Sequence, residues 1–206
     1  MTKIDTVIFD IGNVLIRWDM RNLYRRMFPD DAAITGFLEE TGIAVENHYK
    51  LDAGQSFAEV TAALARRFPH HAEPILALDK RWTDCLDGAI DENVAVLEDL
   101  RRAGNKVHAI TNFSAEKFPT ACRLFPFLTT FDATIVSGAV KLIKPDPAIF
   151  RLLLDQRDID PARAVFIDDS APNIATAKGL GLNTVHFIEG EIDLRADLRR
   201  LGVAGL

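Results

Sequence analysis

Short apolar runs alternate with helical patterns along most of the chain, and this alternation limits the fold more than any other feature. The runs are rich in β-branched and aromatic residues and are bounded by turn residues, as buried strands are. Strands that alternate with helices form a parallel sheet with helices on both faces. Strands are predicted at residues 4–9, 106–110, 133–136, 164–167 and 183–187, and helices at 93–102, 147–154 and 173–180.

The interval from residue 18 to residue 86 departs from this alternation, because it contains no convincing strand. Its apolar residues recur at helical spacing instead. This spacing predicts helices at residues 20–28, 32–41, 57–68 and 74–86. The sequence therefore predicts an α/β fold in which a helical module is inserted after the first strand of a parallel sheet.

Bulk properties argue against several classes of protein. The 206-residue chain has a formal net charge of -6 and dispersed basic pairs, unlike a non-specific nucleic-acid surface. It has no apolar run long enough to span a membrane, and no apolar signal region follows Met1. Cys85 and Cys122 lack metal-ligand spacing and are expected to be reduced thiols. We expect a cytoplasmic monomer or homodimer that binds neither nucleic acid nor membranes.

Polar groups follow four of the predicted strands. In an open parallel sheet, ligands bind beyond the carboxyl ends of the strands, so these groups are expected to share one site. Each residue type alone is more typical of a turn, a helix start or the surface. The set is informative because separate strands would have to place its members together by chance. Its members are Asp10, Thr111, Asn112, Lys144, Asp168 and Asp169.

This set suits phosphate chemistry. Asp10, Asp168 and Asp169 would repel one another unless a cation lay between them, and hard oxygen ligands suit Mg²⁺. The ion and Lys144 would together neutralise a substrate phosphate. One carboxylate could then attack phosphorus and form an aspartyl-phosphate, which water hydrolyses.

The segments that carry these residues resemble the four motifs of the haloacid dehalogenase-like hydrolases, in the same order along the chain. The matching segments are residues 9–15, 111–112, 144–147 and 167–170. The resemblance covers the whole chain and is strongest to the capped sugar-phosphate phosphatases. Among these, the Asp-x-Gly-Asn-Val motif is similar to that of bacterial α-glucose-1-phosphate phosphatase-like proteins. The resemblance implies a Rossmann-like core, residues 1–16 and 88–206, and a small helical cap, residues 17–87.

The resemblance also implies roles for the acidic residues. Asp10 is the nucleophile and a Mg²⁺ ligand, and the Gly12 carbonyl and Asp169 are further ligands. Asp168 is a ligand or orients a metal-bound water. Asn173 stands where many relatives carry another acid, and it is a candidate to hold such a water.

Phosphate and substrate are expected to contact a second group of residues. Lys144 pairs with Asp10 and the phosphate, Thr111 and Asn112 donate hydrogen bonds to it, and Asn13 of the first motif lies nearby. Four cap residues are candidates for the substrate pocket, although each is also typical of cap core or surface. They are Trp18, His48, Tyr49 and Trp82.

Gly12 is a departure from the family pattern. Phosphatases of this group usually carry an acid two residues after the nucleophile, which protonates the leaving oxygen and then activates water. Such a group contributes about 10²–10⁴-fold to the rate. Asp19 is a candidate replacement, although its position is more typical of an N-cap for the helix predicted from residue 20. A good leaving group, such as an anomeric phosphate, would need this acid least.

Three functions follow from these residues. The favoured one is a Mg²⁺-dependent phosphatase that acts on a small phosphorylated metabolite, such as a sugar phosphate, through Asp10. The second is a metal-independent 2-haloacid dehalogenase, against which the acidic pair Asp168–Asp169 argues, because no cation would offset its charge. The third is a catalytically weak phosphate-binding relative that lacks the acid usually found at Gly12.

Overall fold

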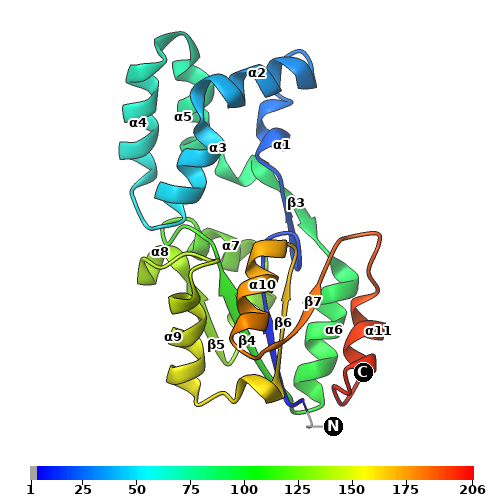
Figure 1. The fold of residues 1–206 in the computed structure, drawn as a ribbon. Coiled ribbons are helices and arrows are strands. Elements are labelled where there is room, and N and C mark those ends of the chain that lie inside the picture. The colour runs from blue at the N-terminus through cyan, green and yellow to red at the C-terminus, as the bar shows by residue number, and fades with distance from the viewer. Residues whose placement is uncertain (1–3) are drawn as a thin grey trace.

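The core of the protein is a five-stranded parallel sheet, as the computed structural model shows for residues 4–206 (Figure 1). The strands lie in the order β5-β4-β1-β6-β7. Their bounds are β1 Thr6–Phe9, β4 Lys106–Thr111, β5 Ala133–Val136, β6 Ala164–Asp168 and β7 Asn183–His186. The predicted α/β fold with a parallel sheet is therefore confirmed, and each predicted strand lies within two residues of an observed one.

Both faces of this sheet are buried, because alternate residues of a strand point to opposite sides. In β1, Val7 and Phe9 pack into one apolar cluster and Ile8 packs into another. The first cluster lies under α6 (Asp91–Arg102) and α11 (Leu194–Arg200), and the second under α9 (Pro147–Arg157) and α10 (Ala171–Gly179). The shorter helices α7 (Phe118–Leu124) and α8 (Ser137–Val140) follow β4 and β5.

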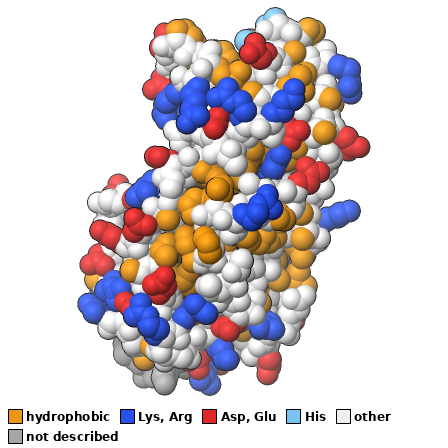
Figure 2. Space-filling view, turned by 180° about the vertical axis from the view of Figure 1, so that it is seen from behind, with side chains coloured by type: hydrophobic (Ala, Val, Ile, Leu, Met, Phe, Trp, Pro, Cys, Tyr) orange, Lys and Arg blue, Asp and Glu red, His pale blue; other side chains and the backbone are white. Residues whose placement is uncertain are grey.

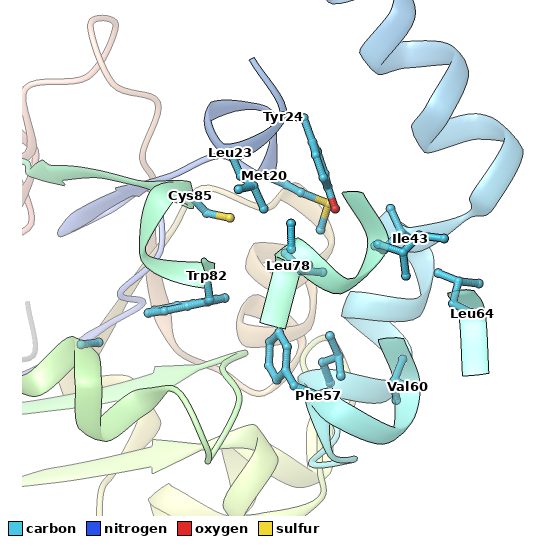
Figure 3. Packing of buried hydrophobic residues seen from close by; sticks show 14 of the residues in the cluster. Met20, Leu23, Tyr24, Ile43, Phe57, Val60, Leu64, Leu78, Trp82 and Cys85 are labelled. Carbon is cyan, nitrogen blue, oxygen red and sulfur yellow. The ribbon is translucent and has the colours of Figure 1, made fainter. Parts of the chain in front are cut away.

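A helical module stands above the carboxyl ends of the strands (Figure 1). Its apolar residues pack α4 against α5 in a cluster that continues into the core at Ile11 and Ala109, and Figure 3 shows Leu23, Leu78 and Cys85 in this cluster, with Trp82 on the side nearest the sheet. Asp19 and Asp30 cap the first two helices with their side chains. The helices are α1 Met20–Tyr24, α2 Asp31–Thr41, α3 Ile43–Glu46, α4 Phe57–Arg67 and α5 Ala72–Lys80, and a π-helical turn covers Asn47–Leu51.

Two short strands correct the sequence prediction. β2 (Ile16–Trp18) and β3 (Leu86–Ala89) form an antiparallel pair that joins the module to the core, so the interval predicted to lack strands begins and ends in one. The helix predicted to reach residue 86 ends at Lys80, because the chain must turn for Leu86 to pair with Trp18. The predicted helix 20–28 likewise ends at Tyr24. The expected boundaries at residues 17 and 88 fall inside this strand pair.

The module also touches the core through a close backbone contact. The Ser137 hydroxyl donates a hydrogen bond of 2.5 Å to the carbonyl oxygen of Asp52. Gly54 lies against Gly138 with a φ of +92°, and a Cβ on Gly54 would lie 2.3 Å from the Gly138 carbonyl oxygen. Only glycine combines this φ with this approach, so Gly54 fixes how closely the module and the core meet.

Gly54→Ala is expected to lower the free energy of unfolding by about 1–3 kcal/mol, because both backbone strain and the clash with Gly138 must be relieved. Chemical denaturation measures this loss. Gly42→Ala is the matched control, since Gly42 has a φ of +65° and open space around its Cβ position. A loss no larger than that of the control would show that the contact is not tight.

On the face in Figure 2, hydrophobic side chains gather around the middle of the molecule, and acidic and basic side chains are interspersed over both lobes.

No helix within residues 4–206 has the length and apolar character needed to cross a membrane. Cys85 and Cys122 are both free cysteines, as predicted.

Candidate active site

The centre of the site is Lys144, a fully buried lysine held between two carboxylates. Its Nζ lies 2.8 Å from Asp10 Oδ2 and 2.7 Å from Asp168 Oδ2. Asp10 follows β1, Asp168 ends β6, and Lys144 lies in the loop before α9. β1 and β6 are neighbours in the sheet, so their carboxyl ends bring the two acids together.

Burial and charge set the ionisation of this group. Burial raises the pKa of Asp10 to about 7, Lys144 opposes the rise, and the negative charge of Asp168 adds to it. Burial also disfavours the charge on Lys144, but Asp10 and Asp168 outweigh it and raise the pKa of Lys144. Lys144 is therefore protonated in this site, and the ionised form of Asp10 costs free energy in the folded protein.

The three acids fit a divalent cation. Oxygen atoms of Asp10, Asp168 and Asp169 all lie within 4.8 Å of one another. Burial and the neighbouring Asp168 raise the pKa of Asp169, which shows that the acids are short of positive charge. Among residues 4–206, Lys144 is the only buried basic side chain apart from His108. A hard cation such as Mg²⁺ would supply the missing charge, and Gly12 lines the same cavity.

Asp168 is already saturated with hydrogen bonds. Besides Lys144, it accepts bonds from the Asn173 amide at 2.9 and 3.0 Å and from the Ser170 N–H at 2.8 Å. Asn173, a candidate to hold a metal-bound water, donates its amide hydrogens to Asp168. Asp169 is half-buried and has fewer hydrogen-bond partners than Asp168 among residues 4–206, so Asp169 is the freer of the two acids to bind a metal.

Asn112 holds the lysine loop in place. Its amide donates to the Lys144 carbonyl at 3.0 Å, and its Oδ1 accepts from the Lys144 N–H at 2.8 Å. Asn112 also lines the cavity, where the sequence predicted it to bind phosphate. Thr111 ends β4 and is fully buried, and within residues 4–206 it is not among the lining residues. A direct contact from Thr111 to phosphate is therefore not visible.

Asn13 shapes the first motif. Its φ of +53° is a left-handed conformation that asparagine tolerates better than most residues. In this position its Oδ1 accepts a hydrogen bond of 3.0 Å from the Trp18 N–H. Asn13 therefore links the first motif to the start of the module.

A cavity of about 500 Å³ opens beside these residues and is lined from both the core and the module. The four module residues proposed for the pocket, Trp18, His48, Tyr49 and Trp82, all line it. Trp82 is nearly buried and packs edge-on against Phe113, with ring centroids 5.4 Å apart, whereas Tyr49 is 64% exposed.

Sequence reasoning missed one titratable residue of this cavity, Asp52. Burial raises the pKa of its carboxyl to about 7, and Lys144 partly opposes the rise. Asp52 follows the π-helical turn that no periodicity predicted, so its only sequence signal was an acid before the Ala53–Gly54 turn.

Asp19, the acid considered as a replacement for the one missing at Gly12, lies outside this cavity. Asp19 accepts a hydrogen bond of 2.8 Å from the Arg21 N–H as the N-cap of α1, and it is absent from the cavity lining described for residues 4–206. Of the two roles that the sequence offered for Asp19, the structure shows the N-cap, which its position favoured. His108 is buried in β4 and lines a different cavity beside Asp5 and Lys106.

Comparisons with known proteins agree on the family. Residues 4–181 match the sequence profile of the haloacid dehalogenase-like hydrolases. Protein CbbY of Cereibacter sphaeroides is 25% identical over 201 residues, which cover 88% of this chain and 83% of CbbY. The sesquiterpene phosphatase astK of Aspergillus oryzae is 24% identical over 190 residues, 91% of this chain and 92% of astK. A (S)-2-haloacid dehalogenase of a Pseudomonas species is 29% identical, but over 48% of this chain and 44% of its own length.

Solved structures share the fold. The enzyme bt-2542 of Bacteroides thetaiotaomicron superposes with a TM-score of 0.74 and 25% identity, over 96% of this chain and all of its own. The same enzyme in complex with magnesium and inorganic phosphate superposes with a TM-score of 0.72, at 24% identity, over 94% of this chain and 98% of its own. The profile match covers most of the chain and includes all four motifs, so this protein belongs to the haloacid dehalogenase-like hydrolase family.

Proposed function

We propose that this hydrolase is a Mg²⁺-dependent phosphatase that releases phosphate from a small phosphorylated metabolite through an aspartyl-phosphate on Asp10. The observation that carries the proposal is the cluster of Asp10, Asp168 and Asp169 around one buried lysine. Three acids with one cation leave a negative site that suits a metal and a phosphate together. The magnesium and phosphate complex of the similar bt-2542 enzyme supports the proposal.

Residues of the chain prepare Asp10 for attack. The Ile11 N–H donates to Asp10 Oδ1 at 2.7 Å and Lys144 lies beside Oδ2, so both oxygens are held in place. Asp168 and Asn112 orient Lys144, whose charge stabilises the carboxylate and would also contact a bound phosphate. Mg²⁺ held by Asp10, Asp169 and the Gly12 carbonyl would neutralise the phosphate. Asp10 can then approach phosphorus without repulsion and form the acyl phosphate.

The cavity limits the substrate. Aromatic side chains from the module and the core face the space beside Asp10, including Trp18, Phe57 and Phe113. Such a lining suits a substrate body with an apolar face, such as a sugar ring or a short isoprenoid. The phosphate would lie at the acidic end. A panel of both classes of phosphomonoester tests this choice.

The dehalogenase alternative requires Asp10 to attack carbon without a metal. The same cluster disfavours it, because Asp168 and Asp169 place negative charge beside Asp10 and a metal-free reaction leaves that charge without a divalent cation to offset it. Halide release from 2-haloacids in the presence of a chelator would favour the dehalogenase. Phosphate binding without turnover of any phosphoester would favour the weakly catalytic relative.

Removal of Mg²⁺ is expected to lower phosphate release by about 10³-fold, because a divalent ion supplies several kcal/mol of charge stabilisation. The measurement is phosphate release from the substrate panel before and after treatment with a chelator, with Mg²⁺ then restored. Full activity in metal-free protein would contradict the proposed mechanism.

A further inference from the structure

We propose that Asp52 of the helical module is the proton donor and acceptor of this enzyme, in the role that Gly12 cannot fill. The inference rests on the proposed phosphatase function. It assigns to the module a catalytic group in addition to its contribution to the shape of the pocket.

The position of Asp52 supports this role. Asp52 lines the same cavity as Asp10, Gly12 and Lys144. Among residues 4–206, the Asp52 carboxyl group has no hydrogen-bond or ion-pair partner, in contrast to Asp10 and Asp168. Asp52 is half-buried at the wall of the cavity, and a partly desolvated carboxyl group without a partner is costly, so its presence there indicates that a ligand group meets it.

The core fixes the backbone of Asp52. Its carbonyl oxygen accepts the Ser137 hydroxyl at 2.5 Å, and the same hydroxyl oxygen accepts the Phe113 N–H at 2.8 Å. Phe113 follows Asn112, which holds Lys144, so Asp52 is tied to the loop that positions the lysine. The tight contact between Gly54 and Gly138 holds the next turn. Asp52 is thus held over the site by contacts outside its own helix.

The charge state of Asp52 matches the task. Burial raises its pKa to about 7, so the neutral acid is populated near neutral pH, where an acid/base catalyst is most effective. The other charged or titratable groups that line the cavity are Asp10, Lys144, Asp169, His48 and Tyr49. Burial lowers the pKa of His48, which makes it a poor proton donor. Asp19 is excluded because it caps α1.

The proposed reaction has two steps. Asp10 forms a bond to phosphorus, the bond from phosphorus to the leaving oxygen breaks, and the proton of Asp52 passes to that oxygen. The Asp52 carboxylate then takes a proton from water as the water oxygen attacks the aspartyl-phosphate. The bond from phosphorus to Asp10 breaks, inorganic phosphate leaves, and Asp52 returns to its acid form.

The experiment compares Asp52→Asn with wild type on p-nitrophenyl phosphate, whose phenolate leaves without a proton, and on hexose 6-phosphates, whose alkoxides need one. Asp52→Asn is expected to lower kcat/KM for the hexose phosphates by about 10²–10⁴-fold and to change kcat/KM for the aryl ester far less.

Two further measurements test the role of Asp52. With the aryl ester, kcat of the variant falls while kcat/KM is nearly unchanged, because hydrolysis of the aspartyl-phosphate loses its base. In wild type, kcat/KM for hexose phosphates falls as the pH rises through about 7, because Asp52 loses its proton. The variant does not show this fall in kcat/KM.

Asp19→Asn is the matched control, because asparagine caps a helix as well as aspartate does. Three results would overturn the role of Asp52 without contradicting the phosphatase function. They are an equal loss of kcat/KM on both substrates, no loss of kcat/KM on either, and a wild type that hydrolyses only the aryl ester. A wild type that releases phosphate from neither substrate would overturn both.

Discussion

Asp10→Asn is expected to lower phosphate release by on the order of 10⁴-fold or more, because an amide cannot form the aspartyl-phosphate. The fold is expected to survive, since asparagine matches the shape of aspartate and Lys144 keeps its bond to Asp168. Phosphate release by purified variant and wild-type protein, with saturating Mg²⁺, measures the loss. The control is Asp155→Asn, an exposed residue on α9. A variant with nearly full activity would show that another group attacks phosphorus.

The same substitution is expected to stabilise the metal-free protein. Burial raises the pKa of Asp10 to about 7 in the folded state, so the ionised form destabilises the fold at higher pH. Asparagine removes that cost above about pH 7, and the gain disappears as the pH falls towards the ordinary pKa of an aspartate, where the acid is neutral in both states. Thermal unfolding at several pH values measures it. In the proposed mechanism, Asp10 therefore lowers the stability of the metal-free fold in return for a reactive carboxylate.

Lys144→Met is expected to have the largest effect on stability, about 3–5 kcal/mol at neutral pH in metal-free protein. Methionine fills similar space but leaves Asp10 and Asp168 buried side by side without their cation. The loss should shrink at acid pH, because an acid without its cation takes up a proton more readily. Activity should also be lost, since no other lining residue of the cavity among residues 4–206 is a lysine or arginine that could contact the phosphate.

Chemical denaturation of Lys144→Met measures this effect, with exposed Lys178→Met as the control, which should change stability by less than about 0.5 kcal/mol. Added Mg²⁺ should recover part of the stability of Lys144→Met, because the ion would bind Asp10 and its neighbouring acids, which no longer have a lysine partner. A variant as stable as the control would mean that the acids are neutral in the folded protein.

The sequence by itself determined the sheet and the main residues of the site. Buried strands leave a local signal, because runs such as residues 164–167 are apolar and bounded by turns. Parallel topology then requires the residues that follow these strands to meet at one edge, which is why Asp10, Lys144 and Asp168 could be named together. Both steps depend only on neighbouring residues and on a general rule of topology.

Only the tertiary structure decided the parts that depend on distant pairing. Ile16–Trp18 and Leu86–Ala89 are too short to show a period, and they are strands because they pair with each other across the whole module. Asp19 and Asp52 are both acids of the module, yet one caps a helix and the other enters the cavity. That difference arises from the contacts of Ser137 and Gly138 with the segment after Leu51, and contacts between residues so far apart leave no pattern in the local sequence.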